Sequence, residues 1–125
     1  MAIAGLGTDI IEIARLGKDD TVTNRLARRI LTEYEYGRYQ NSNTKLAYLA
    51  KRFAAKEATV KAFGTGIGNG VSWQHIEVRN NEAGAPFLTL SGELATLCEK
   101  RGIKQTFLSI SDEQSYAVAT VILES

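Results

Sequence analysis

A long uninterrupted helical pattern over residues 45–63 constrains the fold most. This stretch contains neither Gly nor Pro and is dominated by Ala, Leu, Lys and Glu, which have high helix propensity. Gly64 follows directly, and Gly is common just past the end of a helix. The pattern therefore predicts one helix over residues 45–63, around which the rest of the chain has to pack.

The chain before this helix reads as one strand followed by short helices. An apolar run over residues 2–9 predicts a strand with a polar end at Thr8 and Asp9. Capping residues and breaks then predict three short helices: one to about Arg15, one beginning at Thr23 or Asn24 after a loop at residues 18–20, and one from Thr32 to about Tyr39.

The chain after this helix reads as strands around one further helix. Residues 64–70, GTGIGNG, predict a flexible loop. The expected elements are strands at 76–79, 87–90, 106–110 and 116–123, and a helix at 92–101. We therefore expect one α+β domain over residues 1–125, with a helical N-terminal half packed on a mostly antiparallel sheet that the first strand joins.

The composition excludes several classes of protein. Apolar residues make up 44% and charged residues 23%, so the chain is not expected to be disordered. A net charge of +1 gives no overall attraction to nucleic acid or membrane, and Cys98 alone cannot form an internal disulfide. No apolar run is long enough for a membrane span, and the first residues lack the basic segment of a signal peptide. We expect a cytoplasmic protein.

One glutamate of the long helix falls on its apolar side. On a wheel of about 100° per residue, Glu57 lies within an apolar stripe and Lys61 at its edge. The stripe consists of Leu46, Leu49, Ala50, Phe53, Ala54 and Val60. A carboxylate that faces the core is costly unless it is compensated. Three compensations are open: an ion pair with Lys61, a hydrogen-bond network, or a metal ion.

A second acidic residue, Asp9, follows the apolar first strand. Asp9 and Glu12 have the spacing of a helix capping box, which is one reading. The other is that Asp9 joins Glu57 in binding a cation. Two carboxylates from distant parts of the chain suit Mg²⁺, which takes few protein oxygens and keeps positions for water and phosphate. The glycine loop is either a plain helix end or a place where backbone N–H groups approach a phosphate.

Two segments resemble a known family. Residues 5–15 read GLGTDIIEIAR, and residues 51–64 read KRFAAKEATVKAFG. In this order and spacing they resemble the holo-[acyl-carrier-protein] synthases, the short bacterial type of 4′-phosphopantetheinyl transferase. The resemblance covers essentially the whole chain and extends to Gly66, Asn69-Gly70, Gly84-x-Pro86 and Tyr116-Ala117-x-Ala119.

The resemblance implies an activity and an assembly. A serine hydroxyl of acyl carrier protein attacks the β-phosphate of coenzyme A, takes up the 4′-phosphopantetheine arm and releases 3′,5′-ADP, in fatty acid biosynthesis. Mg²⁺ would be bound by Asp9 and Glu57, and Lys61 would contact the phosphates of coenzyme A. The 4′-phosphopantetheinyl transferase fold would form homotrimers with active sites in the clefts between subunits.

The chemistry of phosphoryl transfer explains these roles. Mg²⁺ neutralises charge on the phosphates, and Lys61 adds a point charge beside it. Glu57 and Lys61 are therefore the catalytic candidates, and the general base is either Glu57 or a metal-bound water. Candidate residues for binding coenzyme A are Lys61, Arg52, Gly64 and Gly66.

An acidic carrier protein calls for a basic docking surface. The candidates are Arg15, Arg25, Arg28 and Arg29, and the alternative is a solvated basic face. A nucleic-acid surface is not expected, because no aromatic residues are interleaved with these arginines.

Two positions depart from the family pattern. Phe107 stands where many relatives carry a histidine, and Ile11 stands where larger relatives carry a third acid, so water would complete the metal shell.

Overall fold

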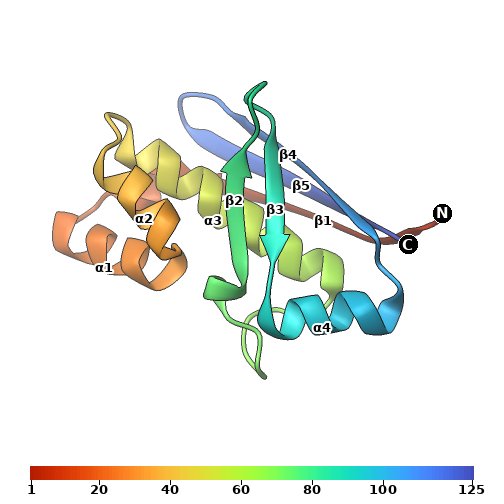
Figure 1. Cartoon of the computed structure of the whole chain (residues 1–125). Helices are drawn as coiled ribbons and strands as arrows, with labels where there is room; N and C mark the ends of the chain where they lie inside the picture. Colours follow the sequence, from red (N-terminus) through yellow and green to blue (C-terminus); the bar gives the residue numbers. More distant parts are fainter.

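The computed structural model describes all residues from 1 to 125 (Figure 1). The elements are β1 (Ile3–Glu12), the 3₁₀ helix η1 (Ile13–Leu16), α1 (Asp20–Ile30), α2 (Glu33–Gln40), α3 (Lys45–Phe63), the 3₁₀ helix η2 (Trp73–His75), β2 (Ile76–Asn80), β3 (Pro86–Leu90), α4 (Gly92–Arg101), β4 (Gln105–Asp112) and β5 (Tyr116–Glu124). The predicted α+β class and the bounds of the long helix are confirmed. Gly64 ends α3 in the left-handed conformation, with φ of 76°.

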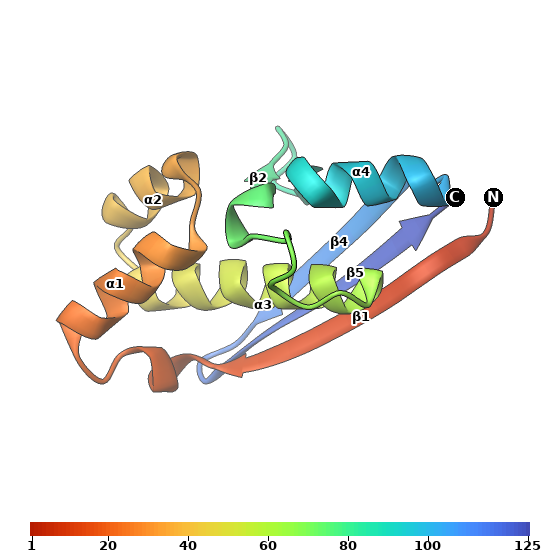
Figure 2. The same cartoon turned by 90° about the horizontal axis from the view of Figure 1, so that it is seen from below.

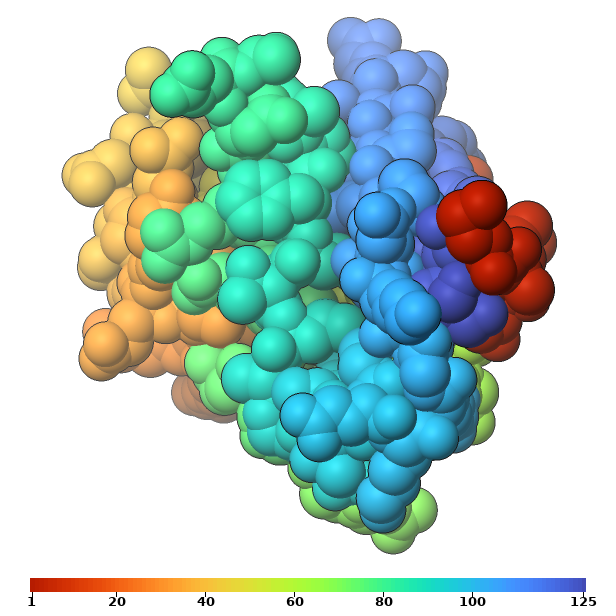
Figure 3. All heavy atoms as spheres, turned by 45° about the vertical axis from the view of Figure 1, so that its right-hand side comes forward, coloured from red at the N-terminus to blue at the C-terminus, as the bar shows by residue number.

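The strands form two antiparallel sheets, where the sequence predicted one. β1, β5 and β4 form a three-stranded sheet in that order, and β2 pairs only with β3. Helix α4 connects β3 to β4, so no tight turn sets these two strands in register, and they contact each other without pairing. Figure 3 shows the first residues, in red, packed against the last ones, in dark blue, where Ser125 N donates to Ala2 O at 2.9 Å.

Helix α3 lies between the two sheets. In Figure 1 it passes behind β2 and β3 and in front of the three-stranded sheet, and Figure 2 shows α1, α2 and α4 around it. The core therefore draws on nearly every side of α3: Ala54, Ala55, Ala58 and Val60 pack with Ile76 and Val78 of β2, Leu94 of α4, and Ala119, Val121 and Leu123 of β5.

The apolar stripe drawn on the helical wheel was wrong about which side is open. Ala55 and Lys56, which are not part of that stripe, are completely buried. Glu57 is half-buried and Lys61 exposed, so they lie on the open side of α3. A helix that is covered almost all round has small and apolar residues on every face, and a wheel cannot then identify the solvent side.

Two glycines allow β1 to lie directly against α3. A Cβ atom on Gly7 would stand 1.9 Å from the carbonyl oxygen of Ala58, and one on Gly5 would stand 2.3 Å from that of Ala62. Because alternate residues of a strand share a face, Asp9 follows Gly7 on the side toward α3. The first motif thus uses its glycines for backbone contact, and this contact brings Asp9 to α3, where it meets Lys61.

Two helix starts were predicted with different success. Helix α1 begins earlier than expected, because Asp19 is its cap and accepts hydrogen bonds from Thr21 N and Val22 N. The predicted loop at residues 18–20 therefore already contains the helix start. Thr23 is turned inward, where its hydroxyl donates to the carbonyl oxygens of Leu16 and Asp19. The predicted start of α2 at Thr32 is confirmed, with a capping box.

A completely buried ion pair joins the helices to the hairpin. Lys56 Nζ donates to Glu35 Oε1 at 2.6 Å, to Ile30 O at 2.7 Å and to Trp73 O at 3.2 Å. Glu35 also accepts from the backbone N–H groups of Thr32 (2.9 Å) and Val78 (2.7 Å). Both side chains have no exposed surface. Glu35 and Lys56 stand 21 positions apart, so no local pattern in the sequence predicted this pair.

Candidate active site

Asp9, Glu57 and Lys61 line one pocket of about 460 Å³. The pocket lies between the end of β1, η1 and the open side of α3, and its other walls are Ile10, Ile11, Glu12, Arg15, Leu16 and Phe53. The structure therefore brings together the three residues predicted from the two motifs. Phe53 was not predicted as a wall residue, although it stands one turn before Glu57 on the same face of α3.

Asp9 is held by a strand. It pairs with Ala119 in the ladder between β1 and β5, so the helix-cap reading of Asp9 and Glu12 is wrong. The Asp9 side chain is 15% exposed, and its Oδ1 accepts a hydrogen bond from Lys61 Nζ at 3.0 Å. The same ammonium donates to Thr8 O at 3.1 Å.

Glu57 stands beside Asp9 without a cationic partner of its own. The predicted alternative of an ion pair between Glu57 and Lys61 is wrong, because Lys61 turns to Asp9 instead. Partial burial raises the pKa of Glu57, the negative charge of Asp9 raises it further, and Lys61 offsets part of this shift. With Glu12 and Arg15 also on its walls, the pocket has three carboxylates and two cations, which leaves an excess of negative charge.

This donor set fits a hard divalent cation such as Mg²⁺. Carboxylate oxygens are the ligands that this ion prefers, and it commonly keeps several positions for water and phosphate. No third acid, histidine or cysteine joins the pair in a ready-made cluster. Ile11, which lines the same pocket, supplies no oxygen from its side chain.

Of the four predicted docking arginines, only Arg15 lines this pocket. The other three lie on α1 and are exposed. The Arg28 guanidinium stacks 4.5 Å from the ring centroid of Tyr36, while Arg25 and Arg29 follow each other by one turn. None of the four forms an ion pair within the chain, so all keep their charge available.

The predicted coenzyme A residues do not all gather in the pocket. Arg52 is only 7% exposed and lies on another side of α3, where its Nη2 donates to Asn80 Oδ1 at 3.0 Å. Its guanidinium stacks 4.6 Å from the ring centroid of Tyr48, and its Nε has no partner. Gly64 and Gly66 lie in the loop after α3, both with positive φ, and do not line the pocket.

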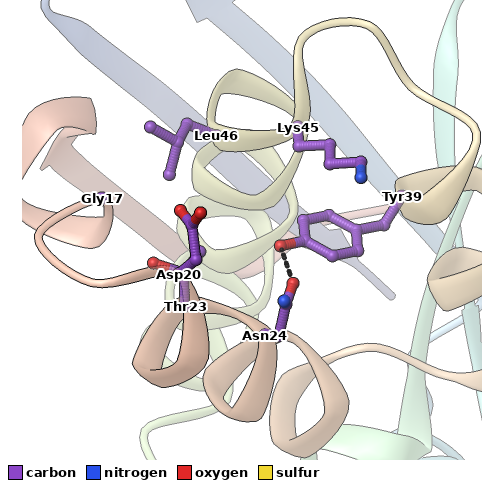
Figure 4. A pocket seen from close by; sticks show the side chains of 7 residues that line it. All are labelled: Gly17, Asp20, Thr23, Asn24, Tyr39, Lys45 and Leu46. Atoms are coloured by element: carbon purple, nitrogen blue, oxygen red, sulfur yellow. Dashed lines mark hydrogen bonds between the residues drawn. The ribbon is translucent and has the colours of Figure 1, made fainter.

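A second, smaller pocket lies between α1, α2 and the start of α3 (Figure 4). It measures about 180 Å³ and contains Asp20 and Lys45. Tyr39 OH donates to Asn24 Oδ1 across it at 2.9 Å. It includes no residue of the two motifs.

None of the helices combines the length and the apolar character needed to cross a membrane.

Comparison with known proteins confirms the family that the two sequence motifs indicated. Residues 5–121 match the family described as the 4′-phosphopantetheinyl transferase superfamily, and the chain belongs to that superfamily. It is similar to the holo-[acyl-carrier-protein] synthase of Alteromonas mediterranea, with 66% identity over 100% of this chain and 99% of that protein. The corresponding protein of Pseudoalteromonas atlantica is 57% identical, with the same coverage.

Solved structures agree in fold. The holo-[acyl-carrier-protein] synthase of Neisseria meningitidis superposes with a TM-score of 0.91 at 38% identity, covering 99% of this chain and 100% of that one. The synthase of Bacillus anthracis, solved in complex with CoA (3′,5′-ADP), superposes with a TM-score of 0.80 at 42% identity, covering 98% and 97%. The predicted family and fold class are therefore confirmed.

Proposed function

We propose that this chain transfers the 4′-phosphopantetheine arm of coenzyme A to a serine hydroxyl of acyl carrier protein and releases 3′,5′-ADP, as a Mg²⁺-dependent step in fatty acid biosynthesis. The observation that carries the proposal is the meeting of Asp9, Glu57 and Lys61 in one pocket. The relatives named for this activity and the relative with bound coenzyme A support it.

Each residue of the pocket has a role that follows from its chemistry. Asp9 and Glu57 would hold Mg²⁺, which supplies positive charge to the pyrophosphate when it is bound. Lys61 offers an ammonium, half exposed, to a phosphate oxygen. Glu57 is the candidate to accept the proton of the serine hydroxyl, and a metal-bound water is the alternative.

The direct test measures the mass of the carrier protein. Incubation of apo-acyl carrier protein with this enzyme, coenzyme A and Mg²⁺ should add the mass of phosphopantetheine, seen by intact-protein mass spectrometry. A carrier whose acceptor serine is replaced by alanine is the control and should not change. An excess of chelator should abolish the gain. An unchanged carrier mass with folded enzyme and Mg²⁺ would refute the activity, and transfer that persists in chelator would refute the role of the metal.

For the nucleotide, we propose a contribution from Arg52 and from the backbone at Gly64 and Gly66. Arg52 is a buried cation without a carboxylate partner, next to Tyr48, whose hydroxyl is also buried and unpaired. Tyr48 lines a pocket of about 350 Å³ together with Arg38, Asn41 and Ser42. The two arginines and the free tyrosine hydroxyl favour the binding of an anion such as a phosphate group. Arg52→Gln should raise the KM for coenzyme A and leave the KM for the carrier unchanged.

For the carrier protein, we propose docking on Arg15, Arg25, Arg28 and Arg29. The arginines of α1 are exposed, Arg15 stands at the catalytic pocket, and none of the four is held in an ion pair. Arg15→Glu or Arg29→Glu should raise the KM for the carrier more than the KM for coenzyme A. Lys100→Glu on α4 makes the same charge change elsewhere and should alter neither. Equal effects on both substrates would contradict the docking assignment.

We also propose a cytoplasmic homotrimer that uses the outer face of the three-stranded sheet. Leu6, Ile10 and Phe107 on this face are 64%, 62% and 49% exposed. Leu6 and Phe107 both stand opposite Ile122 in the ladders, so they belong to one apolar row. Phe107, in the position of a frequent histidine, thus adds to an apolar surface.

The oligomeric state tests this assignment. Light scattering should give about three times the 13.7 kDa of one chain. Leu6→Asp should produce monomers, whereas Val22→Asp, at an exposed apolar residue of α1, should not. A monomeric wild-type chain would contradict the proposal.

A further inference from the structure

We propose that Lys61 couples the binding of the divalent cation to the binding of the substrate phosphates. In the free enzyme its ammonium neutralises Asp9, and when cation and pyrophosphate arrive together it leaves Asp9 for a phosphate oxygen. This inference rests on the proposed function and concerns the same pocket.

The contacts of Lys61 support an exchangeable partner. Its ammonium spans two acceptors of β1, Asp9 Oδ1 at 3.0 Å and Thr8 O at 3.1 Å. It forms no ion pair with Glu57, the carboxylate one turn earlier on its own helix. The Lys61 side chain is 54% exposed, so it can turn toward the open pocket and be solvated there. Lysine has a flexible stem that allows such a movement without a change in the fold.

The charges of the pocket favour a movement of this kind. A divalent cation held by Asp9 and Glu57 would share Asp9 with the Lys61 ammonium, and like charges at such short range repel each other. Lys61 therefore opposes the entry of a cation by itself. A pyrophosphate supplies negative charge for both the cation and the displaced ammonium. Cation and coenzyme A then bind tightly only as a pair.

Linkage gives this coupling a measurable form. If coenzyme A tightens the binding of Mg²⁺, then Mg²⁺ tightens the binding of coenzyme A by the same factor. The structure assigns part of this factor to Lys61, because the residue exchanges one anionic partner for another. A lysine that only held β1 to α3 would stabilise both states equally and would contribute nothing to the coupling.

The test titrates Mg²⁺ into the complete enzyme by isothermal calorimetry, with and without saturating coenzyme A and without carrier protein, so that no turnover occurs. The wild type should bind Mg²⁺ weakly alone and about tenfold or more tightly with coenzyme A, within the usual range of coupling. Lys61→Met should bind Mg²⁺ alone more tightly than the wild type by about tenfold, and the gain from coenzyme A should fall below the wild-type gain by about the same factor.

Arg15→Gln is the matched control. It also removes one positive charge from the wall of the pocket, but Arg15 makes no bond to Asp9. Its effect on Mg²⁺ affinity without coenzyme A should stay well below that of Lys61→Met. An equal effect would mean that only the total charge of the pocket matters, which would overturn the proposal.

Two further outcomes are decisive. Unchanged or weaker Mg²⁺ binding in Lys61→Met, with the gain from coenzyme A retained, would refute the coupling even if the wild type transfers phosphopantetheine. A wild type that fails to transfer, yet loses its coupling in Lys61→Met, would refute the activity and not this inference. Lys61→Gln serves as a second variant, and circular dichroism in chelator shows that each variant is folded.

Discussion

Two of the lysines of helix α3, Lys56 and Lys61, pair with carboxylates in opposite ways. Lys56 meets Glu35 at 2.6 Å with neither side chain exposed, whereas Lys61 meets Asp9 at 3.0 Å with its side chain 54% exposed. The buried pair is satisfied by backbone groups on every side, since Lys56 also reaches Ile30 O and Trp73 O. The open pair leaves a second carboxylate, Glu57, beside it.

The difference in burial distinguishes an ion pair that stabilises the fold from one that can take part in binding. Burial lowers the pKa of Lys56, and Glu35 offsets part of that shift through its charge and its hydrogen bond. A buried ion cannot exchange its partner for water, so the pair has one arrangement and fixes α1, α2, α3 and β2 together. The open pair can be replaced at low cost, which is what a site for exchangeable ions requires.

The largest effect is expected when the buried pair is broken. Lys56→Met should lower the free energy of unfolding by about 3–5 kcal/mol, because Glu35 remains buried without its counter-charge. Urea denaturation measures this loss. The double variant Glu35→Gln with Lys56→Met should be more stable than Lys56→Met alone, since no unpaired charge is left. A loss below about 1 kcal/mol in the single variant would show that the buried pair is no more structural than an exposed one.

Removing the second carboxylate of the open site should cost activity and leave the fold intact. Glu57→Gln should lower the transfer rate by roughly three orders of magnitude, equivalent to about 4 kcal/mol, because the divalent cation loses a ligand. Release of 3′,5′-ADP, followed by chromatography, measures the rate. Glu99→Gln on α4 removes the same charge from an exposed position and should leave the rate unchanged. Loss of structure in Glu57→Gln would instead favour a structural role for this residue.

Breaking the open pair should barely change stability. Lys61→Met removes the same charge from the same helix as Lys56→Met, yet it should lower the free energy of unfolding by less than about 1 kcal/mol, as for exposed ion pairs. Denaturation of both variants under one buffer gives the comparison directly. If the two losses were equal, the contrast in burial would have no energetic meaning.

The smallest effect concerns the pH dependence of stability. Because the pKa of Glu57 is raised above its ordinary value of 4.5, the folded chain binds this proton more tightly than the unfolded chain. Its contribution is fully present below pH 4.5 and is lost as the pH rises through the folded value. In chelator, the stability of Glu57→Gln relative to the wild type should therefore increase with pH across this window. An opposite trend would show that burial and the charge of Asp9 do not together raise the pKa of Glu57.

The sequence by itself determined the features that depend on near neighbours along the chain. Helix propensity and the glycine at its end give α3 its bounds from residue 45 to residue 63, and the capping box at Thr32 marks the start of α2. The two motifs identified the family and named Asp9, Glu57 and Lys61. These signals depend on residues close together in the sequence, so they can be recognised without knowledge of the fold.

The tertiary structure alone decided which side of α3 is open and which partners its lysines choose. The wheel placed Glu57 toward the core, but residues from β1, β2, α4 and β5 cover the remaining sides of the helix and leave Glu57 and Lys61 at the pocket. Lys61 pairs with an aspartate 52 positions away because Gly5 and Gly7 let β1 touch α3. Burial and ion pairing depend on segments distant in sequence, so no local pattern could have predicted them.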